Sequence, residues 1–438
     1  MDGMLISIIV FLLVFVAITF ELVNKAVAAF SGVAVLMLLH VIDEHQAIEY
    51  IDFETIMLLF GMMLIVSVLK HSGLFTIISV RISELTRGNP IKILLLFSIV
   101  TAVMSAFLDN VTTVLIIIPI IIELTRGLGL DPKKYVLSQV IISNIGGTAT
   151  LIGDPPNVII GSKVGLTFNQ FLFNLGPPVL VIFAVVLIFI WITNRDQFKP
   201  INTNIIKLFT VNLLLEKIRH DYLNIKIDRP LMKKGIFFLA IAILLFITQT
   251  ITGFAPGLIA ISAGIFLVLT SGMNLEDAME EVEWSTLMFF VGLFILVGSL
   301  EKYGVIDWIA HNVFLNIGDN PYVVVLVVEW VAGIDSGFLD NIPFTITMIP
   351  IIEIMNESNP HFQNLLWWAL ALGACLGGNI TIIGASANIV SIGIAKKYGV
   401  NISFLEFMKY GAVIAFISLI IASLYLILYI NIFYMGPV

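Results

Sequence analysis

The sequence predicts an all-α polytopic membrane protein built from two inverted repeats. Three observations predict this fold: an apolar composition, a set of motifs duplicated at one offset, and an uneven distribution of basic residues. Of the 438 residues, 59% are hydrophobic and 12% are charged, with a mean hydropathy of +1.06. Soluble domains carry about 25% charged residues. Apolar runs long enough for a helical span of about 20 residues recur along the whole chain, which excludes the soluble classes of protein.

The duplication is visible as short motifs that return in one ungapped register. Phe-Leu-Asp-Asn at 107–110 recurs at 338–341, an offset of 231 residues, and Pro-Ile-Ile at 119–121 recurs at 350–352 with the same offset. A third block keeps this register: Gly146, Gly147, Thr150, Gly153 and Asn157 match Gly377, Gly378, Thr381, Gly384 and Asn388. Several matches in one register indicate an internal duplication.

The basic residues predict how the two halves are oriented. The only long polar stretch, 195–234, is rich in Lys and Arg, so the positive-inside rule places it in the cytoplasm. With each half crossing the membrane an odd number of times, all of the 22 basic residues except Lys163 and Lys302 fall on the cytoplasmic side, Lys25 included. The repeats are then inverted, and both termini lie outside the inner (plasma) membrane. The first apolar run lacks a basic start and is expected to be a retained helix, not a cleaved signal.

This topology divides the chain into four parts. Residues 1–45 form N-terminal helices, and 46–194 form the first repeat, with a re-entrant hairpin at 91–125 and a broken transmembrane helix at 135–165. Residues 195–234 form the linker. Residues 235–438 form the second repeat, with a hairpin at 322–355 and a broken helix at 364–397.

The two breaks, at 146–157 and 377–388, predict a binding site. Adjacent prolines and several glycines prevent a continuous helix in the first break. Irregular backbone at membrane depth is tolerated only where it is buried in protein or lines a cavity. Inverted repeats with broken helices are typical of secondary transporters that bind substrate near the membrane midplane. Free carbonyl, hydroxyl and amide oxygens suit Na⁺, and the start of a half-helix favours an anion.

The carboxylates at the hairpin tips, Asp109 and Asp340, are the sharpest candidates. A carboxylate within an apolar stretch is costly, and is by default a functional hypothesis. We expect Na⁺ or H⁺ to bind there, with Asn110 and Asn341 as neutral co-ligands. The alternative is that each aspartate only caps the following helix. Asp154 has no acidic counterpart in the second repeat, so it either adds proton coupling or charge selectivity to the first half, or caps the helix that follows it.

The full set of candidate ion- and substrate-binding residues combines the tips with the breaks: Asp109, Asn110, Thr112, Ser143, Asn144, Gly147, Thr148, Thr150, Asp154, Asn157, Asp340, Asn341, Thr345, Gly378, Asn379, Thr381, Ser386 and Asn388. No His/Cys set has metal-ligand spacing, and no phosphate-binding Gly-rich motif occurs. We therefore expect no enzymatic activity, no cofactor other than Na⁺ or H⁺ as coupling ions, and no nucleic-acid partner.

These motifs resemble those of the melanosomal P-protein family. The resemblance rests on Leu-Asp-Asn-Val-Thr-Thr at 108–113, Ile-Gly-Asp-Pro-Pro-Asn at 152–157 and Ile-Gly-Ala-Ser-Ala-Asn at 383–388. The wider ion transporter superfamily includes arsenite permeases, sodium/proton antiporters and dicarboxylate or citrate symporters. The resemblance implies a homodimer in the lipid bilayer whose hairpins and broken helices move like an elevator against a scaffold. It also implies that Asp109-Asn110 and Asp340-Asn341 stand where the dicarboxylate branch has Ser-Asn.

These features favour a secondary active ion transporter. The leading interpretation is sodium/proton exchange, or sodium- or proton-coupled transport of a small anion. The alternatives are efflux of arsenite or a related oxyanion, carboxylate symport, and a passive chloride channel, which buried carboxylates disfavour because they repel chloride.

Overall fold

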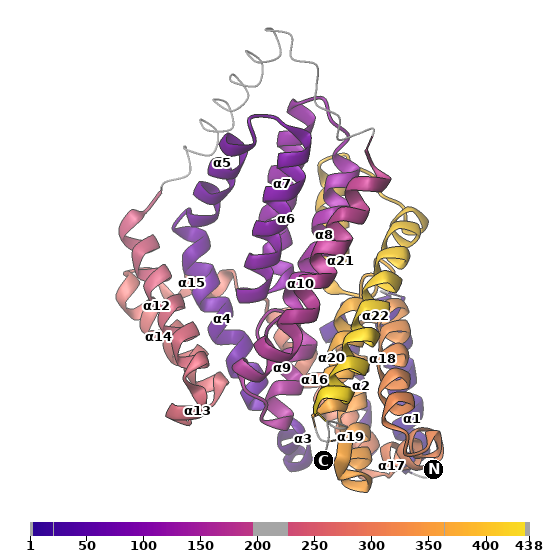
Figure 1. Ribbon diagram of the computed structural model, residues 1–438. Helices are drawn as coiled ribbons and strands as arrows, with labels where there is room; N and C mark the ends of the chain where they lie inside the picture. Colours follow the sequence, from indigo (N-terminus) through magenta and orange to yellow (C-terminus); the bar gives the residue numbers. More distant parts are fainter. Residues whose placement is uncertain (1–2, 21, 196–226, 363, 434–438) are drawn as a thin grey trace.

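The computed structural model describes residues 3–20, 22–195, 227–362 and 364–433, and every regular element within them is a helix (Figure 1). Eight of these helices are long and apolar enough to cross a membrane. The predicted all-α polytopic fold is therefore confirmed. Most of the linker, residues 196–226, lies outside the described residues.

The first half contains ten helices: α1 (Gly3–Thr19), α2 (Lys25–Leu38), α3 (Glu44–Tyr50), α4 (Phe53–His71), α5 (Leu74–Thr86), α6 (Pro90–Phe107), α7 (Asn110–Gly127), α8 (Pro132–Gly147), α9 (Pro155–Val164) and α10 (Phe168–Thr193). The described second half contains α12 (Arg229–Ile247), α13 (Gln249–Thr252), α14 (Pro256–Ser271), α15 (Leu275–Glu280), α16 (Trp284–Lys302), α17 (Val305–Ile309), α18 (Pro321–Phe338), α19 (Asn341–Ser358), α20 (Leu365–Gly377), α21 (Ser386–Lys397) and α22 (Phe404–Phe433). Short π and 3₁₀ turns follow α17 and α19.

The helix boundaries repeat with the offset seen in the motifs. α4, α6 and α7 begin and end 231 residues before α16, α18 and α19, and α2 begins 231 residues before α14. The N-terminal helices, which the sequence assigned to a separate part at 1–45, therefore have counterparts in the second half. The second half also begins earlier than expected from the linker boundary at 234, because Asp228 accepts a hydrogen bond from the Leu231 backbone N–H and starts α12 at Arg229.

The two hairpins point in opposite directions. In Figure 1 the α6–α7 hairpin opens toward the upper end of the molecule, and α18–α19 opens toward the lower end, where α1 begins and α22 ends. Each return helix starts at its aspartate: Asp109 accepts from the Thr112 backbone N–H at 2.7 Å, and Asp340 accepts from that of Ile342 at 3.1 Å. An N-cap carboxylate satisfies donors that the first helical turn leaves free.

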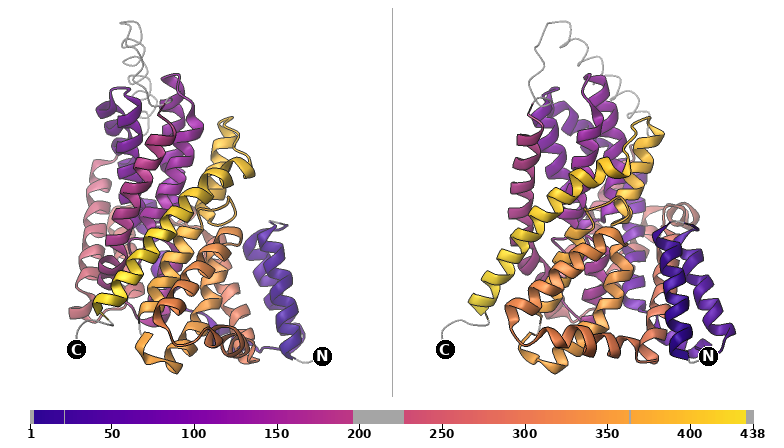
Figure 2. Two further views of the ribbon diagram at one scale, coloured as in Figure 1. Left: turned by 45° about the vertical axis from the view of Figure 1, so that its right-hand side comes forward. Right: turned by 90° about the vertical axis from the view of Figure 1, so that its right-hand side faces the viewer.

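The helices form two flanking three-helix groups and a central core. α4 packs against α12 and α14, while α16 packs against α1 and α2, so each group takes two helices from one half and one from the other. The left view of Figure 2 shows α12 and α14 on one side and α1 and α2 on the other. Between them, the hairpins, the broken helices, α10 and α22 pack together. We call the two flanking groups the scaffold, and the rest the core.

Candidate ion and substrate site

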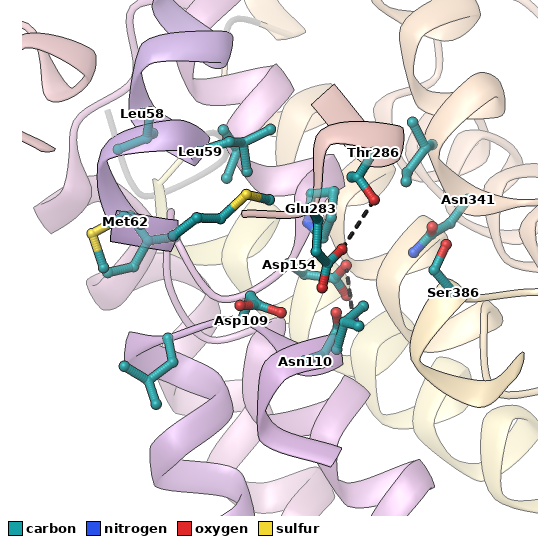
Figure 3. A pocket seen from close by; sticks show the side chains of 17 residues that line it. Leu58, Leu59, Met62, Asp109, Asn110, Asp154, Glu283, Thr286, Asn341 and Ser386 are labelled. Carbon is teal, nitrogen blue, oxygen red and sulfur yellow. Dashed lines mark hydrogen bonds between the residues drawn. The ribbon is translucent and has the colours of Figure 1, made fainter. Parts of the chain in front are cut away.

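Four half-helices begin at one central cavity. α7, α9, α19 and α21 start at Asn110, Pro155, Asn341 and Ser386, and all four residues line a cavity of about 650 Å³ (Figure 3). The rest of its wall is largely apolar and includes Leu58, Leu59, Met62 and Met63 of scaffold helix α4. Since the backbone N–H groups of a helix start carry partial positive charge, the four starts attract negatively charged groups.

Three carboxylates supply that negative charge. Asp109 and Asp154 reach the cavity from the core, and Glu283 reaches it from the start of scaffold helix α16. Among the described residues that line the cavity, none is basic. Glu283 accepts a hydrogen bond from the Thr286 hydroxyl at 3.0 Å. An unpaired cluster of this sign favours a cation, because the carboxylates repel one another and attract any positive ion.

Asp154 is the carboxylate with the least protein compensation. Its side chain is 1% exposed, and Oδ1 accepts from Asn110 Nδ2 at 3.3 Å. Oδ2 is buried and has no hydrogen-bond partner, and the same is true of Asn341 Nδ2 on the facing hairpin. Although Asp154 stands at the start of α9, it makes no side-chain capping bond. The capping alternative is therefore wrong for Asp154, whereas Asp109 and Asp340 both cap their helices.

Behind the cavity, asparagines connect the two broken helices. Asn144 Oδ1 accepts from Asn110 Nδ2 at 3.2 Å, and its Nδ2 donates to Asn379 and Asn388 at 2.8 and 2.9 Å. Asn144 and Asn388 are fully buried. The pseudo-symmetric contact is made by Cys375, whose Sγ lies 3.5 Å from Asn157 Oδ1. This network fixes the four half-helix starts relative to one another.

The breaks are compact loops that only glycine permits at two positions each. An added Cβ at Gly147 would lie 2.5 Å from the Gly153 carbonyl oxygen, and one at Gly378 would lie 2.9 Å from that of Gly384. The loops are closed by two asparagines: Asn157 donates to the carbonyls of Thr148 and Thr150, and Asn388 to those of Gly378 and Thr381. The loop carbonyls are thus largely engaged within the protein.

The remaining candidate residues fall outside the cavity wall. The hydroxyls of Ser143, Thr148 and Thr345 donate to carbonyls within their own helices, and those of Thr150 and Thr381 donate to the hairpin carbonyls of Ala106 and Gly337. Thr112 lines a second cavity with Lys70 and Glu281, which shares Met63 and Glu283 with the first. Most of these hydroxyl groups therefore shape the site without facing it.

Asp340 lies in a different environment from its counterpart Asp109. It forms an ion pair with Lys25 Nζ, which also donates to Ser386 Oγ at 3.2 Å. The sequence placed Lys25 at the cytoplasmic surface; the structure places it at the hairpin tip, because α2 begins beside α19 and not at the end of the molecule. Sequence reasoning also did not select Glu283 or Thr286. Their offset to Asp52 and Thr55, an acid–threonine pair at the start of α4, is the signal that could have identified them.

Comparison with known proteins assigns the family. The model of the citrate transporter family matches residues 15–373. The chain belongs to the citrate transporter family. An uncharacterized transporter of Mycobacterium bovis is 37% identical over 429 residues, which cover 96% of this chain and 97% of that protein. The P protein of Sus scrofa is 35% identical over 94% of this chain and 58% of its own length, which confirms the expected relationship.

A solved structure supports the fold. The crystal structure of the Alcanivorax borkumensis YdaH transporter, described as having an unusual topology, superposes with a TM-score of 0.60 at 13% identity, covering 93% of this chain and 90% of that chain. At this identity the likeness concerns the fold. Together, the family and the relatives make this citrate transporter family member a multi-pass secondary transporter and not an enzyme.

Proposed function

We propose that this family member is a cation-coupled transporter whose central cavity binds Na⁺ and H⁺ in exchange, so that it acts as a sodium/proton antiporter. The observation that carries the proposal is the composition of the cavity: three carboxylates, no basic lining residue within the described chain, and a buried Asp154 oxygen without a partner. A buried carboxylate without a counter-ion is costly. A bound proton or Na⁺ removes that cost, and alternate binding of the two is exchange.

The available oxygens define how Na⁺ would bind. Among the described residues, no group of three or more acidic, His or Cys side chains is gathered closely enough to hold a metal ion. A monovalent ion needs less charge than a divalent one, and Asp154 Oδ2 together with amide and backbone oxygens beside it suffices as a donor set. Asn110 and Asn144 then act as positioning residues, because their hydrogen bonds orient the Asp154 carboxylate.

The cavity has a plausible route to one side of the membrane. Through Met63 and Glu283 it adjoins the second cavity, which contains Lys70 at the end of α4 and Leu115 of α7. Basic residues sit at the same end of the molecule, at the start of α6, the end of α7 and the end of α21. By the positive-inside rule this end is cytoplasmic, so the termini are extracellular and this conformation faces inward.

The alternating step follows from the division into scaffold and core. Glu283 and Met62 belong to the scaffold, whereas Asp109 and Asp154 belong to the core. We propose that the core moves against the scaffold and carries its carboxylates from one side to the other, in the manner of an elevator. Exposed apolar side chains on the scaffold, among them Leu12, Leu13 and Leu269, contact lipid or a second copy in the proposed homodimer.

Paired carboxylate variants test the proposal. In proteoliposomes that contain a pH-sensitive dye, an imposed Na⁺ gradient is expected to drive proton movement without any added anion. Asp154→Asn should abolish this movement. Glu329→Gln is the matched control, because Glu329 is also buried with one unpartnered oxygen but lies in α18, outside the cavity lining. Equal Na⁺-driven proton movement in the wild type and in Asp154→Asn would refute the proposal.

Coupled carboxylate uptake is the second candidate function. It is favoured by the family's name and by the four helix starts that face the cavity, which can bind an anion once cations neutralise the carboxylates. The same liposomes distinguish the two functions. If Na⁺ alone moves no protons, while citrate plus Na⁺ produces uptake, the cavity holds the cations as co-ions of a carboxylate.

A further inference from the structure

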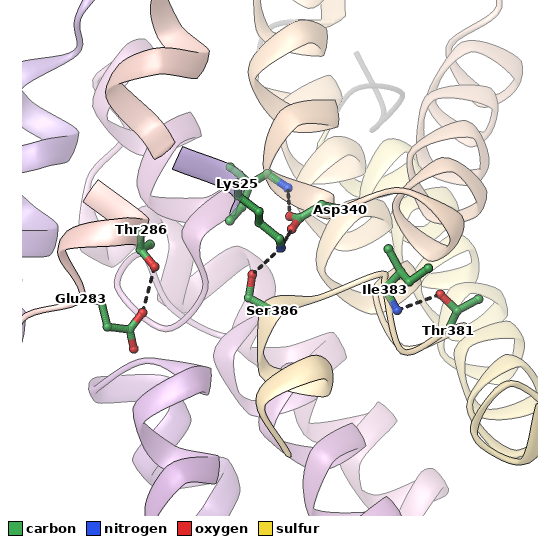
Figure 4. Close-up of polar contacts among 8 residues, drawn as sticks. Lys25, Glu283, Thr286, Asp340, Thr381, Ile383 and Ser386 are labelled. Atoms are coloured by element: carbon green, nitrogen blue, oxygen red, sulfur yellow. Dashed lines mark hydrogen bonds and ion pairs between the residues drawn. The ribbon is translucent and has the colours of Figure 1, made fainter. Parts of the chain in front are cut away.

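The two hairpin tips are related by sequence but opposite in electrostatics. Asp109 and Asp340 occupy equivalent positions, and each caps the helix that follows it. Asp109 faces the acidic cavity with Glu283, whereas Asp340 faces an ammonium group, that of Lys25 (Figure 4). The residue equivalent to Lys25 in the second half is Pro256, which also begins a scaffold helix but carries no charge. The duplication therefore retained both carboxylates and supplied only one of them with a lysine.

The Lys25 ammonium occupies the position that a cation would take. It contacts one oxygen of the Asp340 carboxylate and lies 3.2 Å from Ser386 Oγ, so it has an anionic and a hydroxyl oxygen as partners. The Asp340 side chain is 2% exposed and that of Lys25 is 23% exposed. Ionised groups buried to this degree form stable pairs only when they are matched, and removing one partner leaves a costly unpaired charge.

The backbone around Lys25 is fixed to the scaffold. Asn24 Oδ1 accepts from the Ala26 backbone N–H at 2.9 Å, which starts α2, and from the Ser285 hydroxyl of α16 at 3.1 Å. α2 and α16 also pack against each other along their length. The ammonium group is thus held by the scaffold, while Asp340 and Ser386 belong to the core. Any displacement of the core past the scaffold must break this ion pair.

We infer that Lys25 is a resident counter-ion of the second hairpin: a cation attached to the scaffold that occupies the Asp340 half-site in place of a mobile ion. The first half-site, around Asp109 and Asp154, is then the only one of the pair open to a coupling ion. Lys25 sets the number of cations that the site takes up, and the inference extends the proposed function by giving the two half-sites unequal roles.

Chemical rescue tests this inference without reference to transport. Lys25→Ala removes the ammonium group and leaves room for a small cation beside Asp340. The melting temperature of the detergent-purified protein is measured in choline chloride, and again with Na⁺ or propylammonium in its place at equal ionic strength. We expect Lys25→Ala to melt several degrees below the wild type in choline, and propylammonium or Na⁺ to restore roughly half or more of the loss by binding the folded state.

Two further variants make the result specific. In Lys25→Ala/Asp340→Asn the carboxylate charge is gone, so neither cation should give the added stabilisation. Lys70→Ala is the matched control, because Lys70 also forms an ion pair, with Glu281, but that pair is more exposed and lies within the scaffold. Exposed pairs contribute little, and no rescue is expected there.

The inference is overturned if Lys25→Ala shows no greater response to propylammonium or Na⁺ than the wild type. It is also overturned if the response persists after Asp340→Asn. Because the comparison is between variants in one buffer series, it stands or falls independently of sodium/proton exchange by the wild type. If Asp154→Asn transports normally but propylammonium rescues Lys25→Ala, the proposed exchange fails and the resident counter-ion remains.

Discussion

Replacing Gly147 by alanine tests the compact break of the first broken helix. The new Cβ would lie 2.5 Å from the Gly153 carbonyl oxygen and 3.2 Å from Ser105 Oγ, whereas ordinary contacts begin at 3.4 Å. The facing backbone must therefore retreat by about 0.9 Å, since overpacked groups can be relieved only by such shifts. Gly153 itself contacts the hairpin backbone at Ser105, so the loop cannot retreat freely.

The cost follows from this displacement. Overpacking of a dense interior costs about 1–3 kcal/mol, and a tenfold change in an equilibrium constant corresponds to about 1.4 kcal/mol. We expect Gly147→Ala to lower the melting temperature and to reduce the transport rate at least about tenfold, because Asp154 directly follows Gly153. Gly378→Ala should have the smaller effect, since its Cβ would lie 2.9 Å from the Gly384 carbonyl.

Proteoliposome flux and thermal unfolding measure both effects in the same preparations. The matched control is Gly393→Ala on α21, where an added Cβ meets no atom within 4 Å. Gly61 would be a poor control because its Cβ would lie 2.2 Å from the backbone of Ala260 on α14. Unchanged flux and melting in Gly147→Ala, or a larger effect in Gly378→Ala, would refute the steric argument.

Two further substitutions address the network behind the cavity. Asn144→Ala removes one acceptor and two donors from a fully buried position, so the amides of Asn110, Asn379 and Asn388 lose a partner. At about 1–3 kcal/mol for each buried group left unsatisfied, we expect a marked fall in melting temperature together with loss of flux, and normal flux would contradict a positioning role. Cys375→Ser keeps a donor of similar size near Asn157, so flux should remain within about twofold of the wild type; a loss of flux would instead show that the thiol itself is needed.

The sequence alone predicted the parts of the fold that depend on local pattern. The apolar runs, the Asp-Asn tips and the Gly-Gly breaks are local features, and the offset between them is directly readable, so the hairpins and interrupted helices were expected. The tips and Asp154 line the cavity as the intramembrane carboxylates suggested. The capping role of Asp109 and Asp340 was foreseen as an alternative and exists alongside the site.

The missing parts depend on how distant helices pack. Lys25 follows the first apolar run and reads as a topology signal, and only the packing of α2 against α16 brings it to Asp340. Glu283 ends an acidic surface segment in the sequence, but its side chain turns into the cavity because α16 starts there. The exchange of helices between the two scaffold groups is likewise a tertiary feature, and no local motif reports it.

Direct binding of Na⁺ to the purified protein tests the central claim, that the Asp154 cavity holds one cation in competition with protons. Radioactive Na⁺ bound at equilibrium is measured as a function of pH for the wild type, Asp154→Asn and Glu329→Gln. The account predicts binding by the wild type and by Glu329→Gln that weakens as pH falls, approaching about tenfold per pH unit once protons occupy the site, and no binding by Asp154→Asn. Binding by Asp154→Asn equal to that of the wild type, or binding indifferent to pH, would contradict it.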